Sequence, residues 1–139
     1  MLRIMTAAFL AVLAATQFAY ANPMKEVQLA PINHVDAALT IVGQDGTAVT
    51  YSPAELEEFT TYSMTTTTPW REEPALFEGV LLNELLAASG LDQGISISVT
   101  AENDYSTVLT TELLRSVDIL VATRVNGRPH SRRERGPIQ

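Results

Sequence analysis

The stretch that decides the fold runs from residue 62 to residue 90 and reads YSMTTTTPWREEPALFEGVLLNELLAASG. Its first part, Tyr62 to Thr68, is dense in β-branched threonines, which favour an extended strand over a helix. Pro69 ends this strand, and residues 69–75 are expected to form a polar loop. From Phe77 onward the apolar residues recur with a helical period, and Gly90 follows as a left-handed stop. This second part therefore predicts a helix.

Short elements are predicted on both sides of this stretch. Upstream, two β-branched runs surround Asp45-Gly46, a strong hairpin signal, and form two strands. Ser52-Pro53-Ala54-Glu55 then marks a helix start, because the Ser hydroxyl can accept from a free amide and the Glu can reach back. Downstream we expect strands near 95–100, 105–109 and 118–125, a brief helix capped by Thr110 or Thr111, and a turn at Asn126-Gly127. The sum predicts an α+β fold with a mixed, mostly antiparallel sheet and about three short helices.

Composition limits the chemistry that the protein can perform. The chain has 139 residues, 46% of them hydrophobic, which suits one small domain. It contains no Cys, so a disulfide, a cysteine nucleophile and a thiolate metal ligand are all excluded. The formal net charge of -7 argues against nucleic acid or an anionic membrane as the partner of the whole protein.

The N-terminus has the three regions of a secretory signal peptide. Arg3 gives a positive start, residues 4–15 are almost uninterruptedly apolar, and Ala19-Tyr20-Ala21 is a small-x-small cleavage pattern. An uncleaved membrane anchor is the alternative, but the apolar run is shorter than the roughly 20 residues that cross a bilayer. We therefore expect a signal peptide at 1–21, an extended arm at 22–37 and the domain at 38–139. The protein would be periplasmic or secreted, with no stable membrane insertion after cleavage.

Basic residues gather near the C-terminus. Outside the expected signal peptide and this tail, only Lys25, Arg71 and Arg115 are basic, against fifteen acidic residues. Two interpretations remain open: the tail attracts an anionic ligand, or it pairs with the acidic surface of its own domain. The basic residues of the last sixteen positions are Arg124, Arg128, Arg132, Arg133 and Arg135.

Most catalytic and metal-binding patterns are missing from the sequence. His34 and His130 lie far apart, and neither has the neighbouring ligands that a metal site needs. We find no nucleophile elbow and no phosphate-binding loop, so no catalytic residue and no metal ligand is predicted. What remains is the run from Thr65 to Arg71, where Trp70 and Arg71 follow four hydroxyls and suit a planar or anionic ligand. In the alternative interpretation the threonines are part of a packed strand and Trp70 covers the edge of the core.

Several motifs occur in an order that resembles a known family. They are Thr-Thr-Thr-Thr-Pro-Trp at 65–70, the run 77–86 with Gly90, Asn103-Asp104-Tyr105-Ser106, Ala122-Thr123-Arg124 before Asn126-Gly127-Arg128-Pro129, and Gly136-Pro137. In this order they resemble the molybdopterin-binding domain of the sulfite oxidase family, and more narrowly the short secreted proteins that carry this domain alone.

The resemblance implies a mixed α+β fold around a pterin-dithiolene cofactor, which the full enzymes use for oxygen-atom transfer to or from small oxyanions. In those enzymes a Cys after the Thr-rich strand ligates molybdenum, whereas this chain reads Pro69-Trp70-Arg71. Without that thiolate the metal loses its protein anchor. No cofactor is therefore expected, although the resemblance leaves molybdopterin possible. The family pattern also continues past Gly136-Pro137 into an apolar strand, so the last strand is expected to be truncated.

These observations predict a non-catalytic module that binds a small anionic or planar ligand or a periplasmic protein. In the predicted site Thr66 and Thr68 donate hydroxyls, Trp70 offers a stacking face and Arg71 contacts an anion. Tyr105 and Arg124 are expected to face the same mouth. Two alternatives stay open: a small molybdopterin-dependent oxidoreductase acting on oxyanions, and an interaction module whose basic tail docks to an acidic partner.

Overall fold

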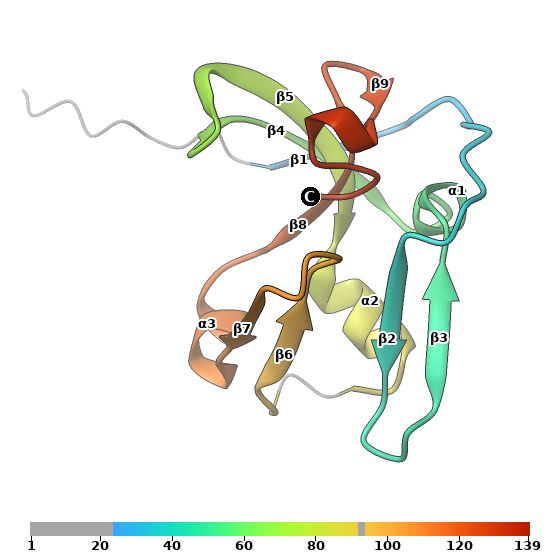
Figure 1. The fold of residues 1–139 in the computed structure, drawn as a ribbon, viewed down its shortest axis with the longest axis vertical. Helices are drawn as coiled ribbons and strands as arrows, with labels where there is room; N and C mark the ends of the chain where they lie inside the picture. Colours follow the sequence, from blue (N-terminus) through green and yellow to red (C-terminus); the bar gives the residue numbers. More distant parts are fainter. Residues whose placement is uncertain (1–23, 92–93) are drawn as a thin grey trace, which may run out of the picture.

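The computed structural model describes residues 24–91 and 94–139, and the expected signal peptide lies outside this part of the chain. Within the described residues, a five-stranded antiparallel sheet is accompanied by two separate β-hairpins and three short helices (Figure 1). The α+β class and the mostly antiparallel pairing predicted from the sequence are confirmed. The central sheet has the order β1 (Lys25–Val27), β4 (Thr61–Thr68), β5 (Arg71–Leu81), β8 (Leu120–Val125) and β9 (Arg128–Pro129).

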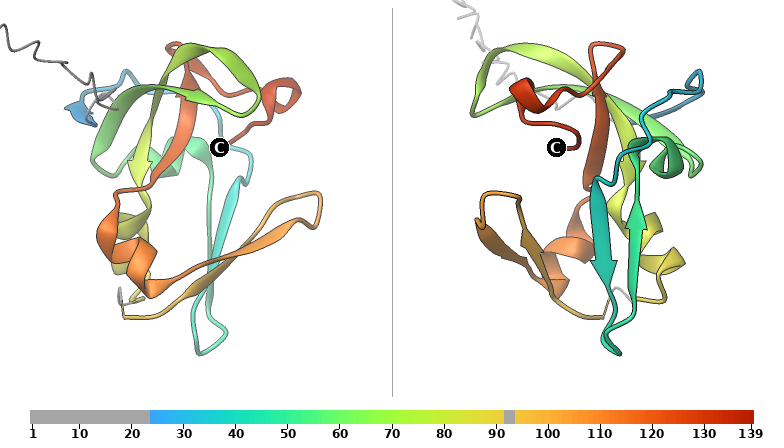
Figure 2. Two further views of the ribbon diagram at one scale, coloured as in Figure 1. Left: turned by 90° about the vertical axis from the view of Figure 1, so that its left-hand side faces the viewer. Right: turned by 45° about the vertical axis from the view of Figure 1, so that its right-hand side comes forward.

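The remaining elements pack around this sheet. One hairpin joins β2 (Leu39–Val42) to β3 (Ala48–Tyr51), and the other joins β6 (Ile97–Thr100) to β7 (Ser106–Leu109). The helices are α1 (Pro53–Leu56), α2 (Leu82–Ala88) and α3 (Thr111–Ser116), and a 3-10 turn, η1 (Arg132–Glu134), follows β9. Figure 2 shows that the two hairpins run in different directions, both at the end of the molecule away from β9 and η1.

Several local predictions are confirmed at the level of single hydrogen bonds. The amide of Glu55 donates to Ser52 Oγ at 3.2 Å, and the amide of Ser52 donates to the Glu55 carboxylate at 2.8 Å, which completes the capping box of α1. Thr110 caps α3 by accepting from the Leu113 amide. Asn126 and Gly127 have φ of 51° and 75°, as their turn requires.

The segment after Pro69 differs from its prediction. Pro69 and Trp70 form a turn, but residues 71–75 of the predicted loop and the first turns of the predicted helix form one strand, β5, and α2 begins only at Leu82. The cause is tertiary, because β5 pairs with β4 on one edge and with β8 on the other. Opposite Glu78 and Gly79, the partner strand β8 contains one extra residue, Thr123, whereas β5 itself is regular at this point. Both faces of β5 are covered, because Val80 and Phe77 belong to two different buried clusters. The resulting spacing of apolar residues imitates a helical period.

Part of the expected arm at 22–37 belongs to the sheet. Residues Lys25–Val27 form β1, which pairs antiparallel with β4. Further along, the carbonyl oxygen of His34 accepts from the Ala54 amide at 3.1 Å, and that of Ala30 accepts from Arg124. These bonds hold the arm against the domain.

The core lies around β5 and β8. One cluster joins Ile41, Leu56, Val80 and Leu85, a second joins Leu82, Leu86 and Leu114, and a third joins Ala75, Phe77, Ala122 and Val125. Close packing demands glycine at position 79, since a Cβ there would lie 2.0 Å from the Val121 carbonyl oxygen. The sheet and α2 thus form a fixed frame for the β4–β5 turn and the C-terminal segment.

Candidate functional site

The β4–β5 turn and the C-terminal segment enclose a hollow of about 400 Å³, here called the tail pocket. Both walls come from segments that the sheet frame positions, because β4 ends and β5 begins at this turn and η1 follows β9. The pocket is lined by Thr68, Trp70, Arg71, Arg133, Glu134, Arg135 and Gln139.

An aromatic ring and a guanidinium group meet in this pocket. The indole of Trp70 is 59% exposed, and the guanidinium carbon of Arg135 lies 4.3 Å from the ring centroid. This distance is that of a cation–π contact. Arg135 reaches the ring from a left-handed backbone conformation, with φ of 74°, at the end of η1. On the other wall the Trp70 amide donates to Thr68 Oγ1 at 3.4 Å.

Positive charge exceeds negative charge in the tail pocket. Arg71 lies 3.7 Å from the carboxylate of Glu134, and both side chains are partly exposed, so this pair is weak. Among the described residues, no carboxylate lies within ion-pair distance of Arg133 or Arg135. Three arginines and one glutamate therefore line a pocket that is open to solvent.

Buried contacts hold the tail wall in place. His130 is 1% exposed, and its Nε2 lies 3.0 Å from Oε1 of Gln139. The backbone amide of Gln139 donates to the Ala122 carbonyl at 3.0 Å, and the Ala122 amide donates to the Gln139 carbonyl at 2.8 Å. Gly136 packs so closely that a Cβ would lie 2.3 Å from the His130 carbonyl oxygen. The pocket is thus preformed on its C-terminal side.

The structure brings together only part of the predicted site. Thr68, Trp70 and Arg71 line the tail pocket. Thr66 lies in β4 outside the lining, and its hydroxyl donates to the neighbouring Thr67 carbonyl at 3.3 Å. Tyr105 is 68% exposed in the turn between β6 and β7 and does not line the pocket.

Arg124 has a structural role that separates it from the tail pocket. Its guanidinium binds the Glu57 carboxylate through Nε at 2.9 Å and through Nη2 at 2.6 Å, and it also donates to the Ala30 carbonyl. The hydrogen bonds that Arg124 donates to the Glu57 carboxylate raise the pKa of Arg124 above its ordinary value, which keeps the guanidinium charged. The side chains of Arg124 and Glu57 are both buried. Neither Tyr105 nor Arg124 lines the tail pocket, so the expectation that these two residues face the same mouth as Trp70 is wrong.

Sequence reasoning did not identify Arg133, Arg135 and Gln139 as pocket residues. The clustering of arginines in the tail was visible in the sequence, and one of its two interpretations was an anionic ligand. The other interpretation also describes part of the structure, because Arg132 binds Glu102 on the domain surface at 2.7 Å. The tail arginines therefore divide between self-pairing and the pocket.

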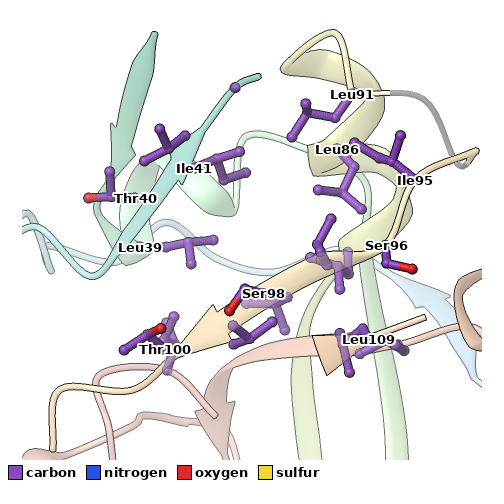
Figure 3. Close-up of a pocket in the computed structure, with 18 of the residues that line it drawn as sticks. Leu39, Thr40, Ile41, Leu86, Leu91, Ile95, Ser96, Ser98, Thr100 and Leu109 are labelled. Atoms are coloured by element: carbon purple, nitrogen blue, oxygen red, sulfur yellow. The ribbon is translucent and has the colours of Figure 1, made fainter. Parts of the chain in front are cut away.

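A second hollow, here called the hairpin groove, lies elsewhere on the molecule. It has a volume of about 600 Å³ and lies between β2, β6, β8 and α2 (Figure 3). Among the residues that the structure describes, no Lys, Arg, His, Asp or Glu side chain lines it, so its described lining differs in chemistry from that of the tail pocket.

Within the part of the chain that the structure describes, no group of three His, Cys, Asp or Glu side chains is arranged to hold a metal ion. The same residues include no helix with the length and apolar character needed to cross a membrane. No protein-family model matches the chain, and no curated protein is significantly similar to it.

Proposed function

We propose that this protein is an extracytoplasmic binding module without a catalytic molybdenum centre, and that its tail pocket takes a small planar anion. The observation that carries the proposal is the exposed Trp70 ring with Arg135 stacked 4.3 Å from its centroid. A planar ligand can pack against the same aromatic and guanidinium planes.

The charges of the pocket favour an anion over a neutral ligand. Of the described residues that line the pocket, Arg71, Arg133 and Arg135 are basic and Glu134 alone is acidic. Guanidinium groups form bidentate hydrogen bonds to carboxylate and phosphate. A hydrogen bond to a charged group contributes about 1.5–3 kcal/mol, so loss of one arginine contact should weaken binding about tenfold or more.

Molybdopterin belongs to this ligand class, which links the proposal to the sequence resemblance. Trp70 would offer a stacking face to the pterin ring, and the arginines would bind its phosphate. In the oxidoreductases the bound group supplies oxygen-atom transfer at its metal. This chain contains no Cys, so its residues suit the organic part of the cofactor and not the protein-ligated metal centre.

The single tryptophan of the chain allows a direct test. Titration with pterin-6-carboxylate, a planar anion, should quench Trp70 fluorescence to saturation, and calorimetry should give the same Kd. Arg135→Ala and Arg71→Ala should each raise this Kd about tenfold, because each removes a cation from the pocket. Arg115→Ala is the matched control, since Arg115 is an exposed arginine on α3 outside the pocket, and it should leave the Kd unchanged.

Three results would contradict the proposal. One is equal affinity of the Arg135→Ala and wild-type proteins. Another is collapse of the fold when Trp70 and Arg71 are replaced together by Ala, because substitution of an exposed residue and a partly exposed one should leave the melting temperature nearly unchanged. The third is stoichiometric molybdenum with oxyanion turnover in protein exported by its own host, which would establish the oxidoreductase alternative.

A further inference from the structure

Gln139 carries the one carboxamide among the described residues that line the tail pocket. The two ends of a carboxamide have opposite hydrogen-bonding properties, because its oxygen accepts and its NH2 group donates. The end that faces a ligand therefore decides which ligands the pocket favours. In this structure the contact between Gln139 and His130 determines that end.

His130 holds the oxygen of this carboxamide. Oε1 of Gln139 lies 3.0 Å from Nε2 of His130, and because a carboxamide oxygen only accepts, the ring nitrogen donates. The ring hydrogen then lies on Nε2, and Nδ1 carries a lone pair. Nδ1 is buried without a hydrogen-bond partner among the described residues. A carboxamide turned the other way would place the ring hydrogen on Nδ1 and bury an N–H group without an acceptor, a state that is rare for the N–H groups of protein backbones.

The ring that holds Gln139 is itself fixed by the sheet. His130 is 1% exposed, and its amide donates to the carbonyl of Thr123, in β8, at 2.9 Å. Ile138, the neighbour of Gln139, packs against the core cluster that contains Val80. The strand β8 thus positions the His130 ring, and the packed backbone beside the pocket positions Gln139.

The NH2 group of Gln139 remains available to a ligand. Among the described residues, no oxygen accepts a hydrogen bond from Nε2 of Gln139, and this nitrogen is not one of the buried polar atoms that lack a partner. It is therefore accessible to solvent, on a residue that lines the tail pocket. A donor that is oriented before binding loses less conformational entropy when a ligand arrives.

We propose that Gln139 makes the tail pocket select planar anions with a carbonyl oxygen on the ring edge over those with an amino group there, and that His130 is its positioning residue. This inference rests on the proposed function, because it concerns the ligand of the same pocket. The arginines bind the negative charge, and the Gln139 NH2 group donates to the carbonyl. An amino group in that place would meet a second donor, so neither group would have an acceptor. His130 does not line the pocket and acts through Gln139.

Two ligands that differ at one edge of the ring test this selection. Pterin-6-carboxylate has an oxo group at C4 and a hydrogen on N3, whereas 2,4-diaminopteridine-6-carboxylate has an amino group at C4 and no hydrogen on N3. Calorimetry with the unaltered protein should give a Kd about tenfold lower for the oxo ligand, because one hydrogen bond is made and no donor is left unpaired. Gln139→Glu keeps an oxygen for His130 but offers the ligand an acceptor, so the preference should reverse. Its added negative charge weakens both ligands, which is why the ratio of the two Kd values is the readout.

Substitutions of His130 separate positioning from structural support. His130→Phe removes the donor and should abolish the preference between the two ligands. His130→Gln supplies an NH2 group in place of the ring Nε2–H and should restore the preference. A merely structural loss would weaken both ligands and leave their ratio unchanged. In the unaltered protein without ligand, a two-bond proton–nitrogen NMR correlation spectrum should show the hydrogen of the His130 ring on Nε2.

Four outcomes would overturn the inference. Equal affinity of the unaltered protein for the two ligands, with Arg135→Ala still weakening pterin-6-carboxylate, would remove the selection and leave the proposed function intact. An unchanged preference in Gln139→Glu would remove Gln139 from the ligand contact. An unchanged preference in His130→Phe, or a ring hydrogen on Nδ1, would remove the positioning role of His130. If neither ligand bound, the proposed function would fail and the selection would fail with it.

Discussion

Burial decides the role of each arginine in this protein. The side chains of Arg124 and Glu57 are 9% and 6% exposed, and the Arg124 guanidinium donates hydrogen bonds to both oxygens of the Glu57 carboxylate. Arg135 has the same chemistry but lies at the surface against an exposed ring. A buried guanidinium holds the fold together, whereas an exposed one remains accessible to a ligand.

Breaking the buried pair should destabilise the fold far more than breaking a surface pair. We expect Glu57→Gln to lower the free energy of unfolding by about 3–5 kcal/mol, because it leaves the Arg124 charge buried without its partner. The free energy is measured by urea unfolding. The control is Glu102→Gln, which breaks the exposed pair with Arg132 and should cost less than about 1 kcal/mol. Equal effects of the two substitutions would contradict the buried role of Arg124.

The candidate site was predictable only where its residues are neighbours in sequence. Thr68, Trp70 and Arg71 could be grouped from the sequence because they occupy one short segment. Arg135 lies sixty-five positions after Trp70, and their contact depends on η1 and on the packing of Gly136 against His130. Residue chemistry and the family resemblance group Arg124 with the site, and only the fold reveals Glu57 beside it.

At the scale of elements, the sequence predicted short local structures better than the long strand. The capping box of α1 and the turn at Asn126-Gly127 are set by a few adjacent residues, and both are confirmed. The extended conformation of β5 depends instead on two partner strands, β4 and β8, that come from distant parts of the chain. Local periodicity could not show this, because Phe77 and Val80 are buried in different clusters, and a strand that is covered on both faces lacks the simple alternation on which a strand prediction depends.

The pairing of β5 with β8 should be sensitive to a single methyl group at Gly79. A Cβ there would lie 2.0 Å from the Val121 carbonyl oxygen and 2.8 Å from the Ala122 Cα, both backbone atoms of the adjacent strand. We therefore expect Gly79→Ala to prevent cooperative folding, as measured by circular dichroism during thermal unfolding. Gly90→Ala is the control, since its φ of 70° strains the new residue but no atom lies within 4 Å. That variant should fold with a loss of about 1 kcal/mol. Native-like melting of Gly79→Ala would contradict the close approach of the two strands.

The whole molecule combines a well-packed sheet with two hairpins of unequal burial. The strands β5 and β8 contribute residues to the buried clusters, and β5 has a paired strand on each edge. In β6 and β7, by contrast, Ile97 and Leu109 are half-buried and the other six residues are exposed. Few buried apolar contacts therefore connect the β6–β7 hairpin to the rest of the fold.

This difference predicts that the molecule opens in two stages. Elements with few buried contacts open locally, at a lower free energy than global unfolding. We expect the Val99 amide of β6, which faces β7, to exchange through such local opening at a rate that low concentrations of urea leave unchanged. The Val80 amide of β5 is fully buried and should exchange only through global unfolding, with a rate that rises steeply with urea. Native-state hydrogen exchange read by NMR measures both amides in one experiment.

If the exchange rates of the Val99 and Val80 amides showed the same urea dependence, the β6–β7 hairpin would belong to the same cooperative unfolding unit as the central sheet.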